Sequence, residues 1–211
     1  PIMTPGWHNI IMAAQTNFGP APLAWLTAVS GDGSLFVAAG QGDFVYTSPD
    51  GVTWTKQTAS GSNTWNNIVV SSDGTKIAGV VNDNTIKLSS DSGVTWSSVT
   101  VEFSGTLGFI AASSTLGIIV VGPTNGNNDF LYVSSDSGAT WTQRATSQAW
   151  NCLASSTDGS ILAGASIDGK LFTSTDGGTT WGQITLPVTP EWYGVSLSGD
   201  VSGFMPSKSL D

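Results

Sequence analysis

Positive charge is scarce in this sequence. Its 211 residues include six Lys and Arg against fifteen Asp and Glu, which gives a formal net charge of −9 at pH 7. A protein that binds nucleic acid or an anionic membrane surface needs clustered Lys and Arg side chains. No apolar run approaches the ~18 residues of a membrane-spanning helix. We therefore expect neither nucleic-acid binding nor membrane insertion.

Cysteine and histidine are almost missing as well, since Cys152 and His8 are the only examples. One cysteine excludes an intrachain disulfide, a CxxC redox pair and a cysteine zinc site. One histidine excludes a multi-histidine zinc site and a histidine-based triad within the chain. Cys152 alternates with apolar residues in "AWNCLAS", which predicts a buried thiol in a strand. We interpret His8 as an edge-strand residue, and we expect no cofactor.

One acidic octet is spelled four times. It reads "SSDSGVTW" from Ser89, "SSDSGATW" from Ser134 and "STDGGTTW" from Ser174, and "SPDGVTW" from Ser48 is a shorter copy. A second phrase, beginning "WNNIVVSSDG" at Trp65, recurs between the octets at about 42-residue spacing. No segment shows sustained helical periodicity. Four short strands per repeat predict an all-β fold, a β-propeller of about five blades with four antiparallel strands each. A β-solenoid is the rival, although its repeats are usually much shorter.

The octet lies between the third and fourth strands of each repeat, where the chain must reverse within a few residues. An Asp carboxylate can accept backbone N–H bonds across such a turn, Gly can take a positive φ, and the Trp can bury its ring against the hairpin. We therefore interpret the octets as structural turns, with these residues: Ser48, Asp50, Trp54, Ser89, Asp91, Gly93, Trp96, Ser134, Asp136, Gly138, Trp141, Ser174, Asp176, Gly178 and Trp181.

The pattern S-x-D-x-G-x-T-W resembles the Asp-box, or BNR repeat. This motif occurs in sialidase-like propellers, some xyloglucan-degrading enzymes, sortilin-type receptors, a photosystem assembly factor and lectin-like propellers. The resemblance implies a structural box that lies away from the ligand face, and it does not fix a function. The sialidase cluster of three arginines is missing, because Arg144 is the only arginine.

The repeats predict one domain over residues 1–211. The units are 25–64, 65–106, 107–149, 150–191, and 192–211 together with 1–24. In the last unit, "TPGWHNII" with Trp7 resembles a fourth strand, so N- and C-terminal strands are expected to close the ring in one blade. The third strand of that blade has no clear counterpart. An open blade leaves an exposed sheet edge, through which a homo-oligomer could form.

Four aspartates fall in the turns between first and second strands, where we expect structural roles: Asp32, Asp73, Asp158 and Asp200. Four others fall in the turns between second and third strands: Asp43, Asp83, Asp129 and Asp168. These turns emerge on the same face as the connections between blades, where four tryptophans begin the first strands and where Glu102, Glu191 and the segment 13–23 also lie. A Trp ring can stack on the C–H face of a sugar, and Asp and Asn side chains can form hydrogen bonds with its hydroxyl groups. We therefore hypothesise a repeated glycan site. The alternative is that the tryptophans wedge between blades. The candidate ligand-binding residues are Trp25, Trp65, Trp150, Trp192, Asp43, Asp83, Asn84, Asp129 and Asp168.

The leading functional hypothesis is a non-enzymatic module that binds a glycan or glycoprotein surface. The alternative is a structural or protein-interaction propeller in a surface assembly, virion or fibre. A glycoside hydrolase needs two opposed carboxyl groups, and nothing in the sequence singles out such a pair. The segment "NGNNDF" (residues 125–130) could offer oxygen ligands to calcium, but it lacks the regular spacing of a calcium loop. We interpret it as a plain Asn-Gly turn. The composition, rich in Ser, Thr and Gly, suggests an extracellular or particle-surface location.

Overall fold

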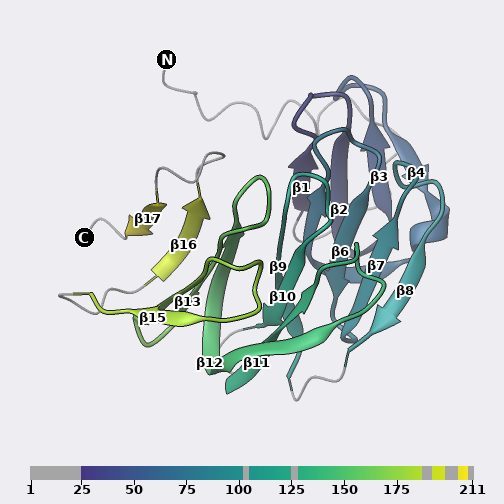
Figure 1. The fold of residues 1–211 in the computed structure, drawn as a ribbon. Helices are drawn as coiled ribbons and strands as arrows, with labels where there is room; N and C mark the ends of the chain where they lie inside the picture. The colour runs from purple at the N-terminus through teal and green to yellow at the C-terminus, as the bar shows by residue number, and fades with distance from the viewer. Residues whose placement is uncertain (1–24, 102–104, 125–127, 187–191, 198–203, 209–211) are drawn as a thin grey trace.

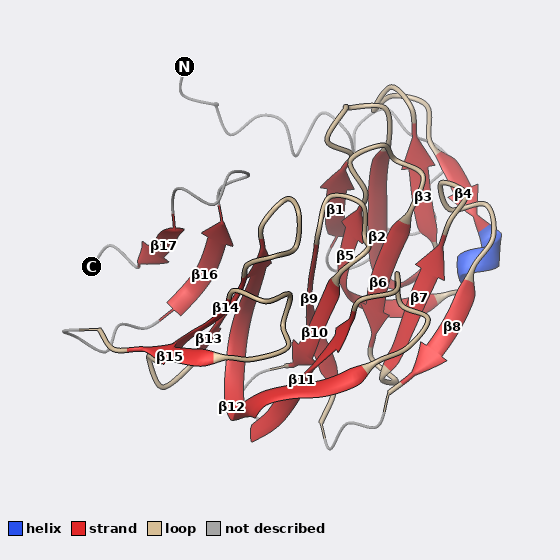
Figure 2. Ribbon diagram, viewed as in Figure 1, coloured by secondary structure: helices blue, strands red, loops and turns tan. Residues whose placement is uncertain are grey.

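The computed structural model describes residues 25–101, 105–124, 128–186, 192–197 and 204–208. This part of the chain is almost entirely strand, and its one helical segment is a short 3₁₀ turn, Thr58–Ser60 (Figure 2). Several expectations concern residues outside these ranges. They are the fourth strand "TPGWHNII" with Trp7 and His8, the segment 13–23, Glu102, Glu191 and Asp200. Ring closure therefore stays a prediction.

The strands fall into consecutive antiparallel units, which we call blades (Figure 1). The first blade contains β1 (Trp25–Val29), β2 (Phe36–Asp43), β3 (Val45–Ser48) and β4 (Thr55–Gln57), and the second contains β5 (Asn63–Val70), β6 (Ile77–Val81), β7 (Thr85–Ser89) and β8 (Ser97–Thr100). The third contains β9 (Leu107–Ala112), β10 (Ile119–Pro123), β11 (Asn128–Ser134) and the start of β12 (Thr142–Ser155), and the fourth contains the rest of β12, β13 (Leu162–Ser166), β14 (Leu171–Ser174) and β15 (Gly182–Ile184). A further pair follows, β16 (Trp192–Leu197) and β17 (Phe204–Lys208).

Each blade is an up-and-down meander in chain order, which rules out the parallel coil of a solenoid. In the second blade β5 pairs with β6, β6 with β7 and β7 with β8, all antiparallel. Neighbouring blades are also joined at their edges: β2 pairs with β5 across Gln41 and Thr64, and β12 continues from the third blade into the fourth.

The second strands of the second, third and fourth blades are buried along their whole length. All residues of β6, β10 and β13 are buried, because a blade is covered by another blade on each side. A strand covered on both faces needs a continuous apolar run rather than alternation. The turns before β6 and β13 are Asp-Gly turns at Gly74 and Gly159, where φ is +69° and +77°, so the turn chemistry expected from the sequence is present there.

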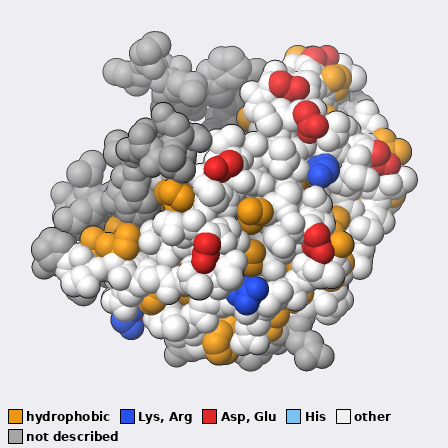
Figure 3. All heavy atoms as spheres, viewed as in Figure 1, with side chains coloured by type: hydrophobic (Ala, Val, Ile, Leu, Met, Phe, Trp, Pro, Cys, Tyr) orange, Lys and Arg blue, Asp and Glu red, His pale blue; other side chains and the backbone are white. Residues whose placement is uncertain are grey.

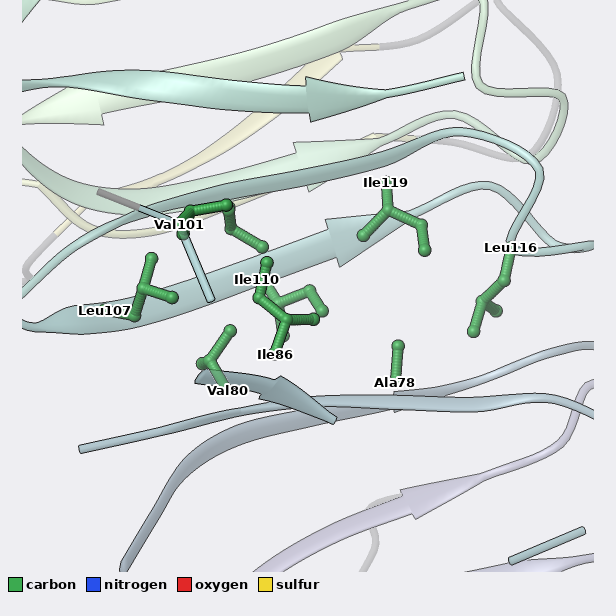
Figure 4. Packing of buried hydrophobic residues seen from close by; sticks show 9 residues of the cluster. Ala78, Val80, Ile86, Val101, Leu107, Ile110, Leu116 and Ile119 are labelled. Carbon is green, nitrogen blue, oxygen red and sulfur yellow. The ribbon is translucent and has the colours of Figure 1, made fainter. Parts of the chain in front are cut away.

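The hydrophobic core is divided into layers that lie between neighbouring blades. Figure 4 shows Ala78, Val80 and Ile86 of the second blade facing Ile110 and Ile119 of the third. Similar clusters join the first blade to the second and the third to the fourth. Cys152 belongs to the layer between the fourth blade and β16, where it is buried, as the sequence predicted.

Backbone hydrogen bonds link the first turn of each blade to the next. The Asp32 N–H donates to the Ser72 carbonyl at 2.9 Å, the Ser72 N–H to Ser114 at 2.6 Å, and the Ser114 N–H to Thr157 at 2.7 Å. These turns and the octets lie on one side of the blades, which we call the turn face. The turns between second and third strands and the connections between blades lie on the other side, the connection face.

Candidate functional site

The three full octets form the same hydrogen-bonded turn, and in the shorter copy Asp50 accepts the N–H groups of Val52 and Thr53 instead. In the third blade the Ser134 hydroxyl donates to Asp136 Oδ1 at 2.8 Å, while the Thr140 N–H and hydroxyl donate to the two Asp136 oxygens at 2.8 and 2.6 Å. The Gly138 N–H donates to Ser134 Oγ, and the Trp141 indole N–H donates to the Gly138 carbonyl. Both oxygens of the carboxylate thus accept hydrogen bonds within the turn.

These hydrogen bonds stabilise the ionised carboxylates of the octets. Bonds from Thr140 and Ser134 lower the pKa of Asp136 to about 2, and bonds from Thr180 and Ser174 do the same for Asp176. Bonds from the backbone of Thr53 and Val52 lower the pKa of Asp50 to about 2. The pKa of Asp91 is lowered too, chiefly by Thr95. Such groups suit a rigid turn and not proton transfer at neutral pH.

The tryptophans that begin first strands are buried between blades, which corrects the stacking hypothesis for three of them. Trp65, Trp150 and Trp192 expose 1%, 0% and 4% of their surface. Their indole N–H groups donate to backbone carbonyls in the preceding blade, those of Asp43, Asp129 and Gly169, at 3.0, 3.0 and 3.1 Å. A buried ring cannot offer its face to a sugar, so these three residues are wedges.

Trp25 occupies the corresponding position in the first blade. It is half-buried, and its ring meets Tyr46 edge-on at a centroid distance of 5.9 Å. It packs against a cluster that also contains Trp54 of the octet in the same blade. Trp25 is therefore part of an aromatic layer of the first blade.

Asp43 and Asp129 also differ from what the glycan hypothesis requires. Each carboxylate accepts the N–H of the phenylalanine that follows it, Phe44 or Phe130, at 2.8 Å. Asp43 also accepts the Tyr46 hydroxyl at 3.2 Å and lies 3.9 Å from Lys56 Nζ, while Asp129 is only 8% exposed. Both carboxylates close their own turns, so we withdraw them as ligand-binding candidates.

Asn84 is a structural residue at the junction where the tryptophan wedge is missing. The third blade begins with Leu107, and Asn84 Oδ1 accepts its N–H at 2.9 Å. Asn84 Nδ2 donates to the Gly105 carbonyl at 2.7 Å. The residue has a φ of +64°, which Asn tolerates better than most residues. The side chain replaces the interblade bond that Trp65 and Trp150 make elsewhere.

The carboxylate of Asp168 is bound by two side chains of its own turn. It accepts the Ser166 hydroxyl, and its Oδ2 lies 2.6 Å from Lys170 Nζ. Desolvation acts to raise the pKa of Asp168, but the hydrogen bonds from Lys170 and Ser166 and the charge of Lys170 lower it overall.

Asp83 is the remaining candidate, and it lines a pocket on the connection face. The pocket has a volume of about 240 Å³ and lies on the second blade, where β5 begins and β6 ends. We call it the Asp83 pocket; its lining is Ser62, Asn63, Thr64, Val81, Asn82 and Asp83. Thr64, Asn82 and Asp83 are exposed, and Asp83 Oδ1 accepts the Thr85 N–H at 3.1 Å. Hydroxyl, amide and carboxylate groups are thus gathered around one opening.

Sequence reasoning missed two asparagines that connect first strands. Asn66 Nδ2 donates to the Leu107 carbonyl at 2.6 Å, and the Asn151 amide donates to the Trp192 carbonyl. The signal was available, because each asparagine directly follows a first-strand tryptophan as "WN". It also missed Asn63, Thr64 and Asn82, although polar runs are visible there in the sequence.

Charge and metal ligands indicate no further site among the described residues on the face shown in Figure 3. On the face shown in Figure 3, acidic side chains stand apart from one another and basic side chains form no patch. The described ranges hold no cluster of three or more His, Cys, Asp or Glu side chains that could bind a metal ion. The "NGNNDF" segment lies partly outside these ranges. No helix in the described part of the chain is long and apolar enough to span a bilayer.

Residues 6–107 match the family model of the DUF6242 β-propeller domain. The chain is similar in structure to the GH74 xyloglucanase from Xanthomonas campestris, with a TM-score of 0.68 and 15% sequence identity over 86% of this chain and 35% of that one. It is also similar to the Niastella koreensis GH74 enzyme, with a TM-score of 0.62 and 24% identity over 77% of this chain and 24% of that one. No curated protein matches it.

The chain is a β-propeller. It spans about a third of the length of the Xanthomonas enzyme and about a quarter of the Niastella enzyme. At these identities the similarity shows the fold alone, as the meanders and interblade layers already indicated. The all-β propeller class expected from the sequence is confirmed, whereas the number of blades in the whole ring stays a prediction.

Proposed function

We propose that this β-propeller is a non-enzymatic carbohydrate-binding module whose recognition site is the Asp83 pocket. The observation that carries the proposal is the pocket itself. Thr64, Asn82 and Asp83 present a hydroxyl, an amide and a carboxylate on one exposed opening, where β5 begins and β6 ends. A sugar displays hydroxyl groups that both donate and accept hydrogen bonds, and these three groups complement them.

Two similarities support a carbohydrate ligand. The structural neighbours include a xyloglucanase with the same fold. The octets resemble the Asp-box, which occurs in several propellers that act on or bind sugars, and here they lie on the turn face, opposite the Asp83 pocket. Recognition of glycans on an extracellular or particle surface is consistent with these similarities.

The carboxylates support binding more than hydrolysis. A glycosidase needs one carboxyl group with a raised pKa that can act as the general acid. Every described aspartate whose pKa departs from its ordinary value has a lowered one, including those of the octets and Asp168. Asp43 and Asp129 are held by their own turns, so Asp83 lacks an evident carboxyl partner among the described residues.

A glycan array followed by calorimetric titration tests the proposal. We expect binding to at least one β-glucan or xyloglucan oligosaccharide, weakened about tenfold or more in Asp83→Ala and Asn82→Ala, because each substitution removes hydrogen-bonding groups from the pocket. Ser98→Ala, at an exposed position on β8, is the matched control and should bind like the wild type.

A null array, or binding that both pocket variants leave unchanged, would refute the site. Release of reducing ends from a xyloglucan or β-glucan panel, abolished by Asp→Asn at position 43, 83, 129 or 168, would show a hydrolase instead.

A further inference from the structure

A second cavity lies on the turn face, between the second and third blades. Its volume is about 420 Å³, within the range of small-molecule sites. Leu88 and Val99 of the second blade and Leu116 and Ile119 of the third give it apolar walls, and the latter two are visible in Figure 4. Lys76 and hydroxyl groups of the two octets give it a polar margin. We call this cavity the Lys76 groove.

At one position beside the groove, the second blade has a shorter side chain than the first. Strand pairing makes the partners Val45 with Gln57 and Ile86 with Val99 equivalent. Gln57 donates to Thr47 Oγ1 at 2.7 Å and packs against Gly93 of the next octet, since a Cβ on Gly93 would lie 3.4 Å from Gln57 Cγ. In the second blade Leu88 approaches the equivalent Gly138, and the shorter Val99 lines the groove.

Lys76 is a cation at a position that is apolar in the other blades. Its N–H donates to the hydroxyl of Ser71, which begins its turn, and Leu35, Ile118 and Ile161 make the same bond in their blades. Lys76 is a half-buried residue, and its ammonium donates to Ser137 Oγ at 3.1 Å.

The ammonium of Lys76 also differs from those of two other lysines. Lys56 and Lys170 each lie near a carboxylate, whereas no carboxylate oxygen of the described residues lies within salt-bridge distance of Lys76. A partly desolvated ammonium is favourable when an anion shares its environment. The groove thus combines an apolar body with a cation whose protein partner is a neutral hydroxyl.

We propose that the Lys76 groove binds a small organic anion, with an apolar ring against Leu88, Val99, Leu116 and Ile119 and a carboxylate on Lys76 Nζ. This site is independent of the Asp83 pocket, which lies on the opposite face. The octet carboxylates of Asp91 and Asp136 hold hydrogen bonds within their own turns. The net charge of −9 slows the approach of an anion, but salt screens it beyond about 8 Å at physiological ionic strength.

A matched pair of probes tests the role of the charge. We expect 2-naphthoate to bind, with shifts of the Leu88, Val99 and Leu116 methyl signals in carbon-13 NMR spectra. Its neutral isostere 2-naphthamide should bind about tenfold or more weakly, because it cannot pair with the ammonium. Equal affinity for the two probes, or no binding of either, would overturn the proposal.

Three variants test the placement. Lys76→Met carries an apolar residue like those of the other blades, so it should fold and should remove the preference for 2-naphthoate, whereas Lys76→Arg should retain it. Val99→Gln places in the second blade the residue that fills the space in the first, and it should weaken both probes about tenfold or more. Unchanged naphthoate binding in both Lys76→Met and Val99→Gln would contradict the site.

Discussion

Single residues fasten the blades together on the connection face. Trp65, Trp150 and Trp192 combine a large buried ring with one hydrogen bond to the preceding blade. Asn84 provides two hydrogen bonds at the junction that begins with Leu107. The same mechanical role is therefore carried by different chemistry, apolar burial in one case and amide bonding in the other.

Substitution of Asn84 tests this role. Asn84→Gly keeps the positive φ but loses both amide bonds, so we expect the free energy of unfolding to fall by about 1–3 kcal/mol. Asn84→Ala adds the cost of a positive φ, about 1 kcal/mol more. Urea unfolding followed by tryptophan fluorescence measures both values. If neither variant loses stability, the interblade role of Asn84 is wrong.

Burial of the first-strand tryptophans could not be predicted from their spacing. A tryptophan at the start of an inner strand fits both an exposed platform and a wedge, and the choice depends on which backbone carbonyl of the neighbouring blade lies within reach. For Trp150 that carbonyl belongs to Asp129, 21 residues earlier. Asp83 was identified from its turn position, whereas its pocket partners Thr64 and Asn82 come together only through the pairing of β5 with β6.

At the level of elements, the octet is a self-contained unit. All of its side-chain hydrogen bonds to Asp136 come from residues two to four positions away. Local bonds of this kind depend on the sequence within the turn and little on the rest of the fold. This is why the turn could be predicted from the sequence, and with it the two strands that it joins.

Acid should unfold the protein only at low pH. Because the folded pKa of Asp136 and Asp176 is about 2, below the ordinary value of 3.8, their contribution to stability is present above about pH 4 and is lost as the pH falls towards 2. Urea unfolding between pH 7 and pH 2 measures this. We expect Asp136→Asn to be less stable at pH 7 and to lose less stability on acidification. An equally steep loss in this variant would contradict the role of the carboxylate.

Across the whole molecule, stability depends on the layers between blades. Cys152 reports on one of these layers, because it packs with Ala165, Leu171 and Trp192 between the fourth blade and β16. Burial raises the pKa of its thiol to about 11, so both access and thiolate formation oppose reaction.

We expect a thiol reagent such as iodoacetamide to label native Cys152 orders of magnitude more slowly than the urea-unfolded chain, with a rate set by opening of this layer. Mass spectrometry at intervals measures the labelling. Rapid labelling of the native protein would show that β16 does not cover the fourth blade.

The central claim is that the first-strand tryptophans hold the blades together and that recognition belongs to polar groups beside them. Hydrogen–deuterium exchange of the nine indole N–H groups, followed in nitrogen-15 NMR spectra, tests it most directly. We predict that the indoles of Trp65, Trp150 and Trp192 exchange more slowly than those of the half-buried octet residues Trp96, Trp141 and Trp181. If the first-strand indoles exchange as fast as the octet indoles, their rings are accessible and the claim is wrong.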